Sequence, residues 1–476
     1  MRERIVFTAF LLSGIALRLI AMNQLDWFFG ESLHVDEITW TAGDTPPFER
    51  PPANYLLASV SGSIPVLRTV YSIISLLPAA VFFMLRNKSM KNSVLAGVLA
   101  VEPTLLFSGL QVMPEAPAAA FLAGALCLAE KRKHLPAGIL IGAAALFRGE
   151  LLLFIPVSLF FIRPLRNWGA AAAGTAAAVL PVLTVNLVSG GPFAPGANGT
   201  LNLWLGSSWE LLTTPPGIEY EELAGDDSFT DNAVNAILRS PIGWLGRGAV
   251  KAAAFFIVPG PGRNMETSSL LKGSILVFLI PVTVILMALA AAGLKKNAAS
   301  SLIVTGIIAA FVFFPSVRHR AILIPAFAAA ASTFRWKPAI PAALCILWLS
   351  LFMQYPGRVR PGLNHLLIAE HLLEKGEFTG SLSRLERAEA EGFEGADIHN
   401  LRGACIASSG GDLGLALQEF SMALRMAPES PSAWRNMAVI LWDTGHIQDA
   451  VTAAEKAVSL NPELRAELTP VLSCPQ

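Results

Sequence analysis

The sequence predicts an all-α protein in which a polytopic bundle of about eleven membrane-spanning helices precedes a soluble helical solenoid. Of the 476 residues, 53% are hydrophobic and only 15% are charged, which is far from the balance of a soluble globular protein and indicates a chain that lies in a bilayer. After residues 354–362 the composition changes to that of a charged helical segment. We therefore expect a membrane domain over residues 1–357 and a repeat domain over residues 358–476.

Apolar runs that approach the ~30 Å thickness of a hydrocarbon core recur through the first domain. They cover residues 5–22, 66–85, 92–110, 116–129, 135–149, 150–162, 168–189, 273–293, 301–315, 321–334 and 338–353. Several runs are short or contain proline and glycine, so the count is accurate to within one or two spans. The stretch 241–258 is interrupted by Arg247 and Lys251, and we expect it to lie at the membrane interface.

Clusters of lysine and arginine mark alternate ends of these runs, and such clusters identify the cytoplasmic ends of membrane spans. The clusters are Arg2/Arg4, Arg86/Lys88/Lys91, Lys131/Arg132/Lys133, Arg163/Arg166, Lys295/Lys296 and Arg335/Lys337. With an odd number of spans, residues 23–65, residues 190–272 and the repeat domain then lie on the outer side. We expect a multi-pass protein of a bacterial inner membrane, with its C-terminal domain extracytoplasmic.

Residue pairs 34 positions apart recur in the second domain, and this is the period of the tetratricopeptide repeat. The pairs are Gly411 and Gly445, Ala416 and Ala450, Ala423 and Ala457, and Pro428 and Pro462. An earlier unit fits with one inserted residue, because Gly376, Leu385 and Ala388 precede the next unit by 35 positions. Small residues let paired helices approach closely, and a stacked solenoid presents a concave groove. We therefore expect this domain to bind a protein partner.

Polar residues near the start of the chain follow a recognisable order. Arg18 lies near the outer end of the first run, the Asp36–Glu37 pair lies in the first outer loop, and Arg50 precedes two prolines. A carboxylate pair in a loop is by itself an ordinary solvated turn, but this order resembles the start of the C-type glycosyltransferases. Within that class the sequence looks similar to the superfamily of protein O-mannosyltransferases and aminoarabinose transferases. The resemblance implies inverting transfer of a sugar from a polyprenyl- or dolichyl-phosphate carrier.

The resemblance continues through residues 5–340. Glu115 stands at the outer start of the fourth run, where the family carries its second acidic residue, and Arg148 resembles the arginine of a turn after the fifth run. Asn198 and Asn202 match an Asn-Gly and Asn-Leu pattern in the outer loop, which is implied to contact substrate.

A late segment containing Arg318 and Arg320 resembles the family's Arg-Tyr-Arg sequence. Two positions depart from the family pattern, because Arg50 stands where a histidine or lysine is usual and Trp40 stands near a common tyrosine. The first loop is also short. These departures concern the donor sugar and the acceptor more than the fold.

The chemistry of the reaction assigns roles to these residues. Transfer from a sugar phosphate to a hydroxyl or amine needs a carboxylate that takes the acceptor's proton, and Asp36 is our candidate, with Glu37 and Glu115 beside it. Glu115 could orient the acceptor, pair with an arginine, or bind a divalent cation with Asp36. The leaving phosphate needs fixed cations, and arginine supplies them in a rigid fork. The candidates for donor-phosphate binding are Arg50, Arg148, Arg318 and Arg320.

We expect a membrane glycosyltransferase that moves a sugar from a polyprenyl-phosphate carrier to an extracytoplasmic lipid, glycan or protein, with its site between the first loop and residues 190–270. The alternative is a non-catalytic protein, either a transporter of lipid-linked glycans or a scaffold that recruits partners through its repeats. The formal net charge is zero, so no basic field gathers nucleic acid. No zinc-ligand spacing is present, so we assign no metal-ligand residues and no certain cofactor, and the divalent cation shared by Asp36 and Glu115 stays an alternative.

Overall fold

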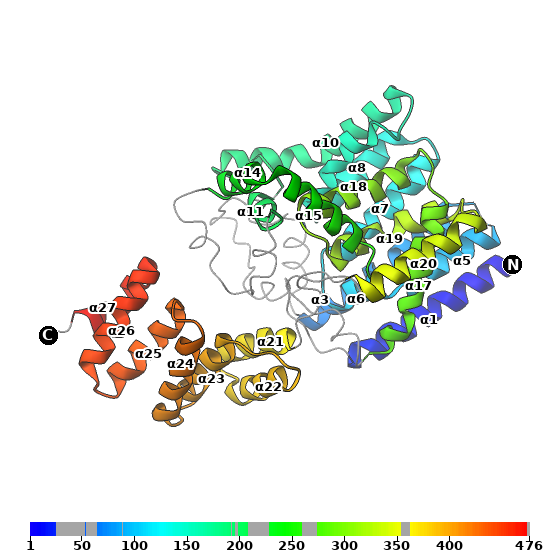
Figure 1. Ribbon diagram of the computed structural model, residues 1–476. Coiled ribbons are helices and arrows are strands. Elements are labelled where there is room, and N and C mark those ends of the chain that lie inside the picture. The colour runs from blue at the N-terminus through cyan, green and yellow to red at the C-terminus, as the bar shows by residue number, and fades with distance from the viewer. Residues whose placement is uncertain are drawn as a thin grey trace. The chain divides into compact units, whose positions relative to one another are not determined.

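The computed structural model describes residues 1–24, 53, 64–87, 89–191, 193–195, 199–207, 228–258, 274–353 and 362–473. Contacts divide the chain into two compact units near residue 360. All secondary structure within the described residues is helical, as predicted, and Figure 1 shows the helices in chain order.

The first unit contains eighteen described helical segments. They are α1 (Arg2–Gln24), α3 (Ile64–Ile74), α4 (Leu77–Leu85), α5 (Met90–Val101), α6 (Pro103–Leu110), α7 (Glu115–Glu130), α8 (His134–Ala145), η2 (Gly149–Leu153), α9 (Phe154–Ser158), α10 (Leu165–Val188), α11 (Gly199–Leu205), α14 (Phe229–Arg239), α15 (Pro241–Ala254), η3 (Ile275–Leu279), α17 (Ile280–Ala292), α18 (Ala298–Val312), α19 (Val317–Ala331) and α20 (Trp336–Phe352).

The predicted count of eleven spans is not confirmed. Among the described residues, four helical segments are long and apolar enough to cross a membrane, and a bent pair raises the number to five. The four segments are Arg2–Asn23, Val66–Leu85, Leu165–Val188 and Ile275–Ala292. The bent pair is α5 with α6, which meet at 41° because the run 92–110 breaks at Glu102 and Pro103.

The other predicted runs form shorter helices, and two of these make up the core of the unit. α7 has 16 residues and α19 has 15, so each spans only about 24 Å or less. Nearly every side chain of α19 is buried, and the two helices pack against each other. A helix enclosed by protein does not need the full length that a lipid-facing span needs.

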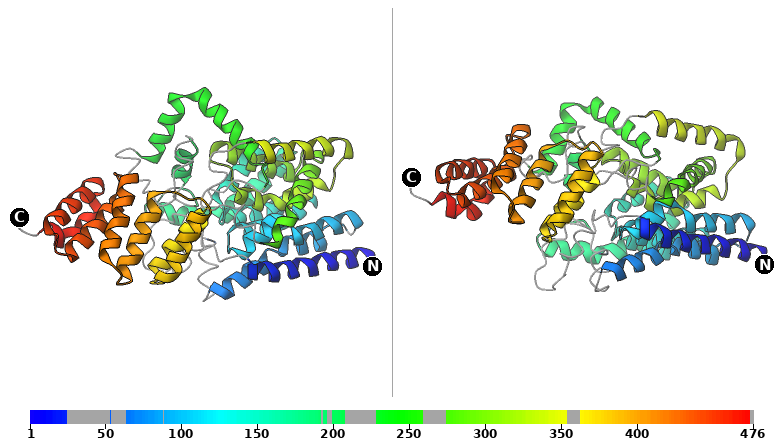
Figure 2. Two further views of the ribbon diagram at one scale, coloured as in Figure 1. Left: turned by 60° about the horizontal axis from the view of Figure 1, so that its bottom comes forward. Right: turned by 90° about the horizontal axis from the view of Figure 1, so that it is seen from below.

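Helices at the outside of the first unit carry their large apolar side chains outward. Leu12 and Leu19 of α1 are exposed, and so are Leu344 and Leu351 of α20. α1 packs along α5 with its other face (Figure 2). An apolar exterior around an interior that contains buried polar groups is the distribution expected for a bundle surrounded by lipid.

α8 and α10 approach each other through glycine. A Cβ atom added to Gly138 would lie 2.0 Å from the carbonyl oxygen of Ala171, and one added to Gly174 would lie 2.2 Å from that of Leu135. Only glycine permits this separation, and small residues at helix contacts are characteristic of packing in membranes. Thr175 of α10 also links the two helices, because its hydroxyl donates a hydrogen bond to the carbonyl oxygen of Gly138 at 3.1 Å.

Arg18 links α1 to α3 and α5. Its guanidinium donates five hydrogen bonds, including one to the carbonyl of Ala100 at 2.7 Å and one to the hydroxyl of Ser75 at 2.9 Å. The side chain is buried. The arginine that opened the sequence resemblance therefore joins the ends of α1, α3 and α5.

The second unit is a stack of helical hairpins, which Figure 1 colours from yellow to red along the chain. Its helices are α21 (Leu363–Glu374), α22 (Phe378–Ala390), α23 (Ala396–Ser408), α24 (Leu413–Met426), α25 (Pro431–Asp443), α26 (Ile447–Leu460), η4 (Pro462–Leu464) and α27 (Arg465–Leu472). The three pairs from α21 to α26 confirm the two strong repeats and the earlier one.

The hairpin turns explain the inserted residue. Gly376, Gly410 and Gly445 end the first helix of each pair with φ of 75°, 73° and 81°, a conformation in which glycine is favoured. The glycine of the turn in the middle repeat is therefore Gly410. It is not Gly411, which the 34-residue spacing had paired with Gly445. Gly411 is the extra residue, and Asp412 after it caps α24 by accepting from the amide of Gly414 at 2.8 Å.

Candidate functional site

A buried ion cluster forms where three elements of the first unit begin or end. Glu115 is the first residue of α7, Arg148 lies between α8 and η2, and Arg318 lies in the first turn of α19. Ser316 fixes the start of α19, because its hydroxyl accepts from the amide of Arg318 at 3.2 Å. Three residues far apart in the sequence therefore converge at one end of the core helices.

The two arginines bind the same oxygen of Glu115. Nη1 of Arg148 donates to Oε1 at 2.9 Å, and Nε of Arg318 donates to Oε1 at 2.8 Å. The Glu115 side chain is fully buried, while the side chains of Arg148 and Arg318 are 14% and 12% exposed. Two largely buried guanidinium groups thus share one oxygen of a fully enclosed carboxylate.

The second oxygen of Glu115 is buried and lacks a hydrogen-bond partner within the described part of the chain. A buried acceptor without a donor costs free energy, of the order of 1–3 kcal/mol, and more when the group is charged. Buried polar groups in folded proteins are nearly always satisfied, so the few exceptions point to places where a ligand or another segment supplies the partner.

Glu150 and His319 extend the cluster. Nε of Arg148 donates to Oε1 of Glu150 at 2.8 Å, and Nε2 of His319 lies 3.6 Å from the same oxygen. The Nδ1 atom of His319 is buried and has no hydrogen-bond partner among the described residues. The cluster therefore contains two acids, two arginines and a buried histidine that lies beside Glu150.

Arg320 does not join the cluster. Its Nη1 donates to the carbonyl oxygens of Phe255 at 3.2 Å and Ile257 at 2.5 Å, at the end of α15. On an α-helix, positions 318 and 320 differ by about 200° around the axis, so their side chains leave on opposite sides. The sequence grouped them by proximity along the chain, although the helical period separates them.

Several predicted site residues lie outside the described residues: Asp36, Glu37, Arg50 and Asn198. Asn202 is described, and it lies half-buried in α11. No group of three or more His, Cys, Asp and Glu side chains that could hold a metal ion occurs in the described ranges. The divalent cation that Asp36 and Glu115 could share therefore stays a prediction.

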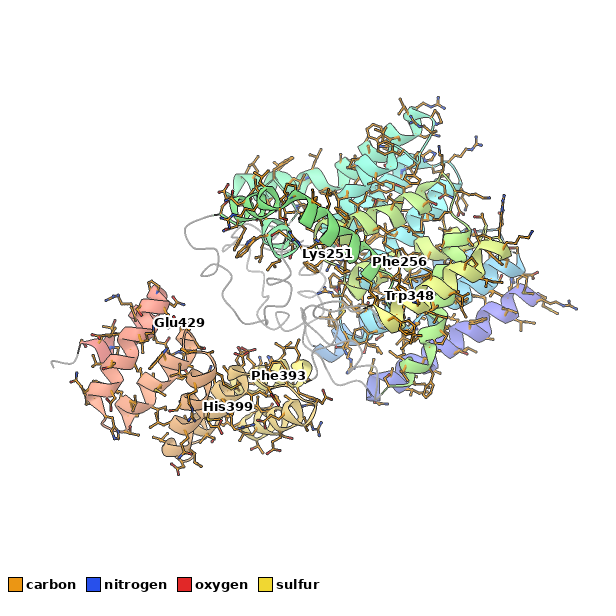
Figure 3. The ribbon with its side chains drawn as sticks, viewed as in Figure 1. Lys251, Phe256, Trp348, Phe393, His399 and Glu429 are labelled. Atoms are coloured by element: carbon orange, nitrogen blue, oxygen red, sulfur yellow. The ribbon has the colours of Figure 1, made fainter. Side chains whose placement is uncertain are left out.

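Two buried charged residues, Glu102 and Lys251, make contacts that the sequence analysis did not predict. Glu102, between α5 and α6, accepts from the amide of Leu105 at 2.7 Å and from the hydroxyl of Thr283 at 2.5 Å. Lys251 of α15 donates to the carbonyls of Gly206 at 2.6 Å, Phe313 at 2.8 Å and Val312 at 3.1 Å, and Figure 3 labels it on its helix. The signal was present, because each interrupts an apolar stretch.

Comparison with known proteins defines the class of the second unit only. The tetratricopeptide repeat family matches residues 366–431, so the repeats predicted from the 34-residue period are present. None of the curated proteins matches this chain. Among solved structures, the crystal structure of yeast Tom70 shares 11% identity over 85% of this chain and 95% of that chain, with a TM-score of 0.26, which is too low to support an argument.

Proposed function

We propose that the chain is a multi-pass membrane protein that transfers a sugar from a polyprenyl-phosphate carrier to an extracytoplasmic acceptor. The observation that carries the proposal is the pair of arginines, Arg148 and Arg318, held on one buried oxygen of Glu115. Paired guanidinium groups match the oxygens of a phosphate, and they stabilise the charge that grows on a leaving phosphate.

The remaining features of the cluster suit the same reaction. The partnerless Oε2 of Glu115 can accept a hydrogen bond from an acceptor hydroxyl or amine. In this scheme Glu115 positions the arginines and the acceptor, and Asp36 of the first outer loop takes the acceptor's proton. Bond formation between the acceptor oxygen or nitrogen and the sugar carbon then breaks the bond to the phosphate, which leaves on its lipid. The repeats would bring the enzyme to a protein partner or to its acceptor.

A second candidate is a membrane-anchored scaffold without catalytic activity. It is favoured by the tetratricopeptide repeats, which in general mediate protein–protein contacts, and by the pairing of opposite charges within the cluster. A cluster of ion pairs that only stabilises helix packing would contain the same contacts between arginines and carboxylates. The two candidates differ in whether the arginines meet a ligand.

The test is a transfer assay with the purified full chain, a labelled pool of polyprenyl-phosphate sugars and membrane extract as the source of acceptor. Asp36→Asn should lower turnover by ~10²-fold or more while it keeps donor binding, because it removes the proton acceptor and little else. Arg318→Ala should weaken both donor binding and turnover. Arg166→Ala is the matched control, since this arginine is exposed at the start of α10.

Full activity of the Asp36 variant, in a protein that is inserted and folded like the parent, would show that Asp36 is not the catalytic base. Failure of the parent protein to transfer any lipid-linked sugar would favour the scaffold. In that case affinity purification of the full chain, with and without residues 363–476, should recover a partner only when the repeats are present.

A further inference from the structure

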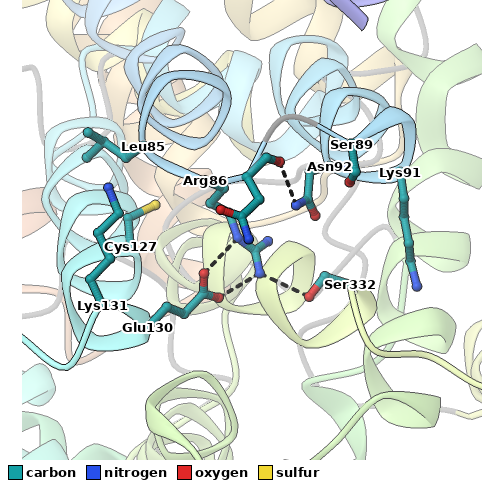
Figure 4. Close-up of a pocket in the computed structure, with 10 residues that line it drawn as sticks. Leu85, Arg86, Ser89, Lys91, Asn92, Cys127, Glu130, Lys131 and Ser332 are labelled. Carbon is teal, nitrogen blue, oxygen red and sulfur yellow. Dashed lines mark hydrogen bonds and ion pairs between the residues drawn. The ribbon is translucent and has the colours of Figure 1, made fainter.

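A cavity of about 380 Å³ lies at the end of the core helices that is opposite to the Glu115 cluster (Figure 4). Glu115 begins α7 and Glu130 ends it, and only Glu130 lines the cavity. α19 likewise begins beside Arg318 and ends beside Ser332, which lines the same cavity. Because each helix extends for about 22 Å, the two sites are separated by most of a membrane thickness.

The cavity carries a positive balance. Arg86, Lys91 and Lys131 line it against a single acid, Glu130. These are the basic clusters that the positive-inside rule places in the cytoplasm, and the structure brings three of their members around one space. Figure 4 shows Lys91 and Arg86 coming from opposite sides of the turn that joins α4 to α5.

Arg86 is fixed in place but incompletely satisfied. Its Nε and Nη2 bind the two oxygens of Glu130 at 2.9 and 2.6 Å, and Nη2 also donates to Ser332 at 3.0 Å. Only 8% of its side chain is exposed, and Nη1 has no hydrogen-bond partner in the described chain. A guanidinium with a buried, unused donor calls for another acceptor oxygen.

The start of α5 adds further positive potential. Ser89 caps this helix by accepting from the amide of Asn92 at 3.2 Å, and both residues line the cavity. The first turn of a helix attracts anions, because its amides and its dipole present partial positive charge. The start of α5, the two lysines and the buried arginine therefore all favour an anionic ligand.

Apolar residues beside the cavity identify the source of that ligand. Leu85 lines it, and Met84, Met90 and Val94 on the adjoining helices are exposed. Acyl chains can pack on this surface while a headgroup enters the cavity. Basic pockets between helices on the cytoplasmic side are known to hold anionic headgroups.

We propose that this cavity binds the phosphate of an anionic phospholipid headgroup in the cytoplasmic leaflet. The inference rests on the proposed membrane location and not on the proposed transfer reaction. The lipid would bridge α4, α5, α7 and α19 through their shared cavity, and it would thereby stabilise the inner ends of the core helices. A water-soluble phosphate would satisfy the cations but leave the apolar rim uncovered.

The test is lipid retention by the purified full chain, measured by native mass spectrometry with phosphatidylglycerol, with phosphatidylcholine and with inorganic phosphate. The double variant Lys91→Gln with Lys131→Gln removes two exposed cations from the cavity. The control is Lys295→Gln with Lys296→Gln, which removes the same charge from exposed positions that do not line it. We expect the cavity variant to lose phosphatidylglycerol by about tenfold or more relative to the control.

Equal retention of phosphatidylglycerol by the cavity variant and the control would overturn the proposal. Equal binding of phosphatidylcholine and phosphatidylglycerol by the parent would do the same, because it would show that the anionic charge is not recognised. Binding of inorganic phosphate without preference for the phospholipid would replace the lipid by a soluble anion. Because the readout is lipid mass, failure here is distinct from failure of the sugar-transfer assay.

Discussion

At the scale of single residues, one buried oxygen of Glu115 accepts a hydrogen bond from each of two arginines, Arg148 and Arg318. Glu115→Gln should destabilise the first unit by about 3–5 kcal/mol, because both guanidinium groups lose their shared carboxylate. Adding Arg318→Gln should restore part of that loss, because the two changes remove interacting partners. Thermal unfolding in detergent of the parent, the two single variants and the double variant measures this coupling. Strictly additive losses would show that the contact is energetically unimportant.

Lys251 offers a second test at this scale. Its ammonium group is the donor for three backbone carbonyls from α18 and the end of α11. Lys251→Met keeps the length of the side chain but leaves those carbonyls without their donor, so the unfolding free energy should fall by about 2–3 kcal/mol. Lys295→Met, at an exposed position, is the control. An unchanged midpoint for Lys251→Met would mean that water replaces the ammonium group.

Sequence reasoning about the site succeeded where it used helix ends and failed where it needed helix faces. Glu115, Arg148 and Arg318 each stand at an end of an apolar run, and the structure brings them into contact. Arg320 also stands near an end, but it points to α15 because two positions along a helix reverse the direction of the side chain. The roles of Asp36, Glu37, Arg50 and Asn198 stay predictions, because they lie outside the described residues.

At the scale of elements, the contact between α8 and α10 depends on the absence of a side chain. Gly138→Ala would place Cβ 2.0 Å from a carbonyl oxygen, so the helices must separate. We expect a loss of about 1–3 kcal/mol in unfolding free energy, as in other overpacked cores. Gly169→Ala, in α10 with nothing within 4 Å, should be neutral or slightly stabilising. Equal unfolding temperatures of the two variants would contradict the claim that the contact between α8 and α10 requires glycine at position 138.

Helix lengths explain why the predicted number of spans is not confirmed among the described residues. Hydropathy detects apolar runs but not whether a helix faces lipid or protein, and α7 and α19 are apolar because they form the core. The break between α5 and α6 was visible only as Glu102 followed by Pro103 within an apolar run. The repeats were easier to predict, because their period is set by the packing of identical units.

At the scale of the whole molecule, the repeat unit should fold without the first unit. It has its own buried cores around Leu385, Phe420 and Ala454. Its Cys405 is buried, and the thiol donates a hydrogen bond to the hydroxyl of Ser381. Burial raises the pKa of this thiol. A fragment of residues 360–476 with Cys474→Ser should therefore resist thiol reagents in buffer and react rapidly in denaturant. Rapid reaction in buffer would show that this unit needs the rest of the chain.

We propose that the repeats lie on the extracytoplasmic side of the membrane and that the basic cavity lies on its cytoplasmic side. Single cysteines at Glu429 in the repeats and Lys133 near the cavity, in a chain without its native cysteines, report the two sides directly. A membrane-impermeant thiol reagent should label Glu429→Cys only in intact spheroplasts and Lys133→Cys only in inverted vesicles. Labelling of both positions from the same side would contradict this topology.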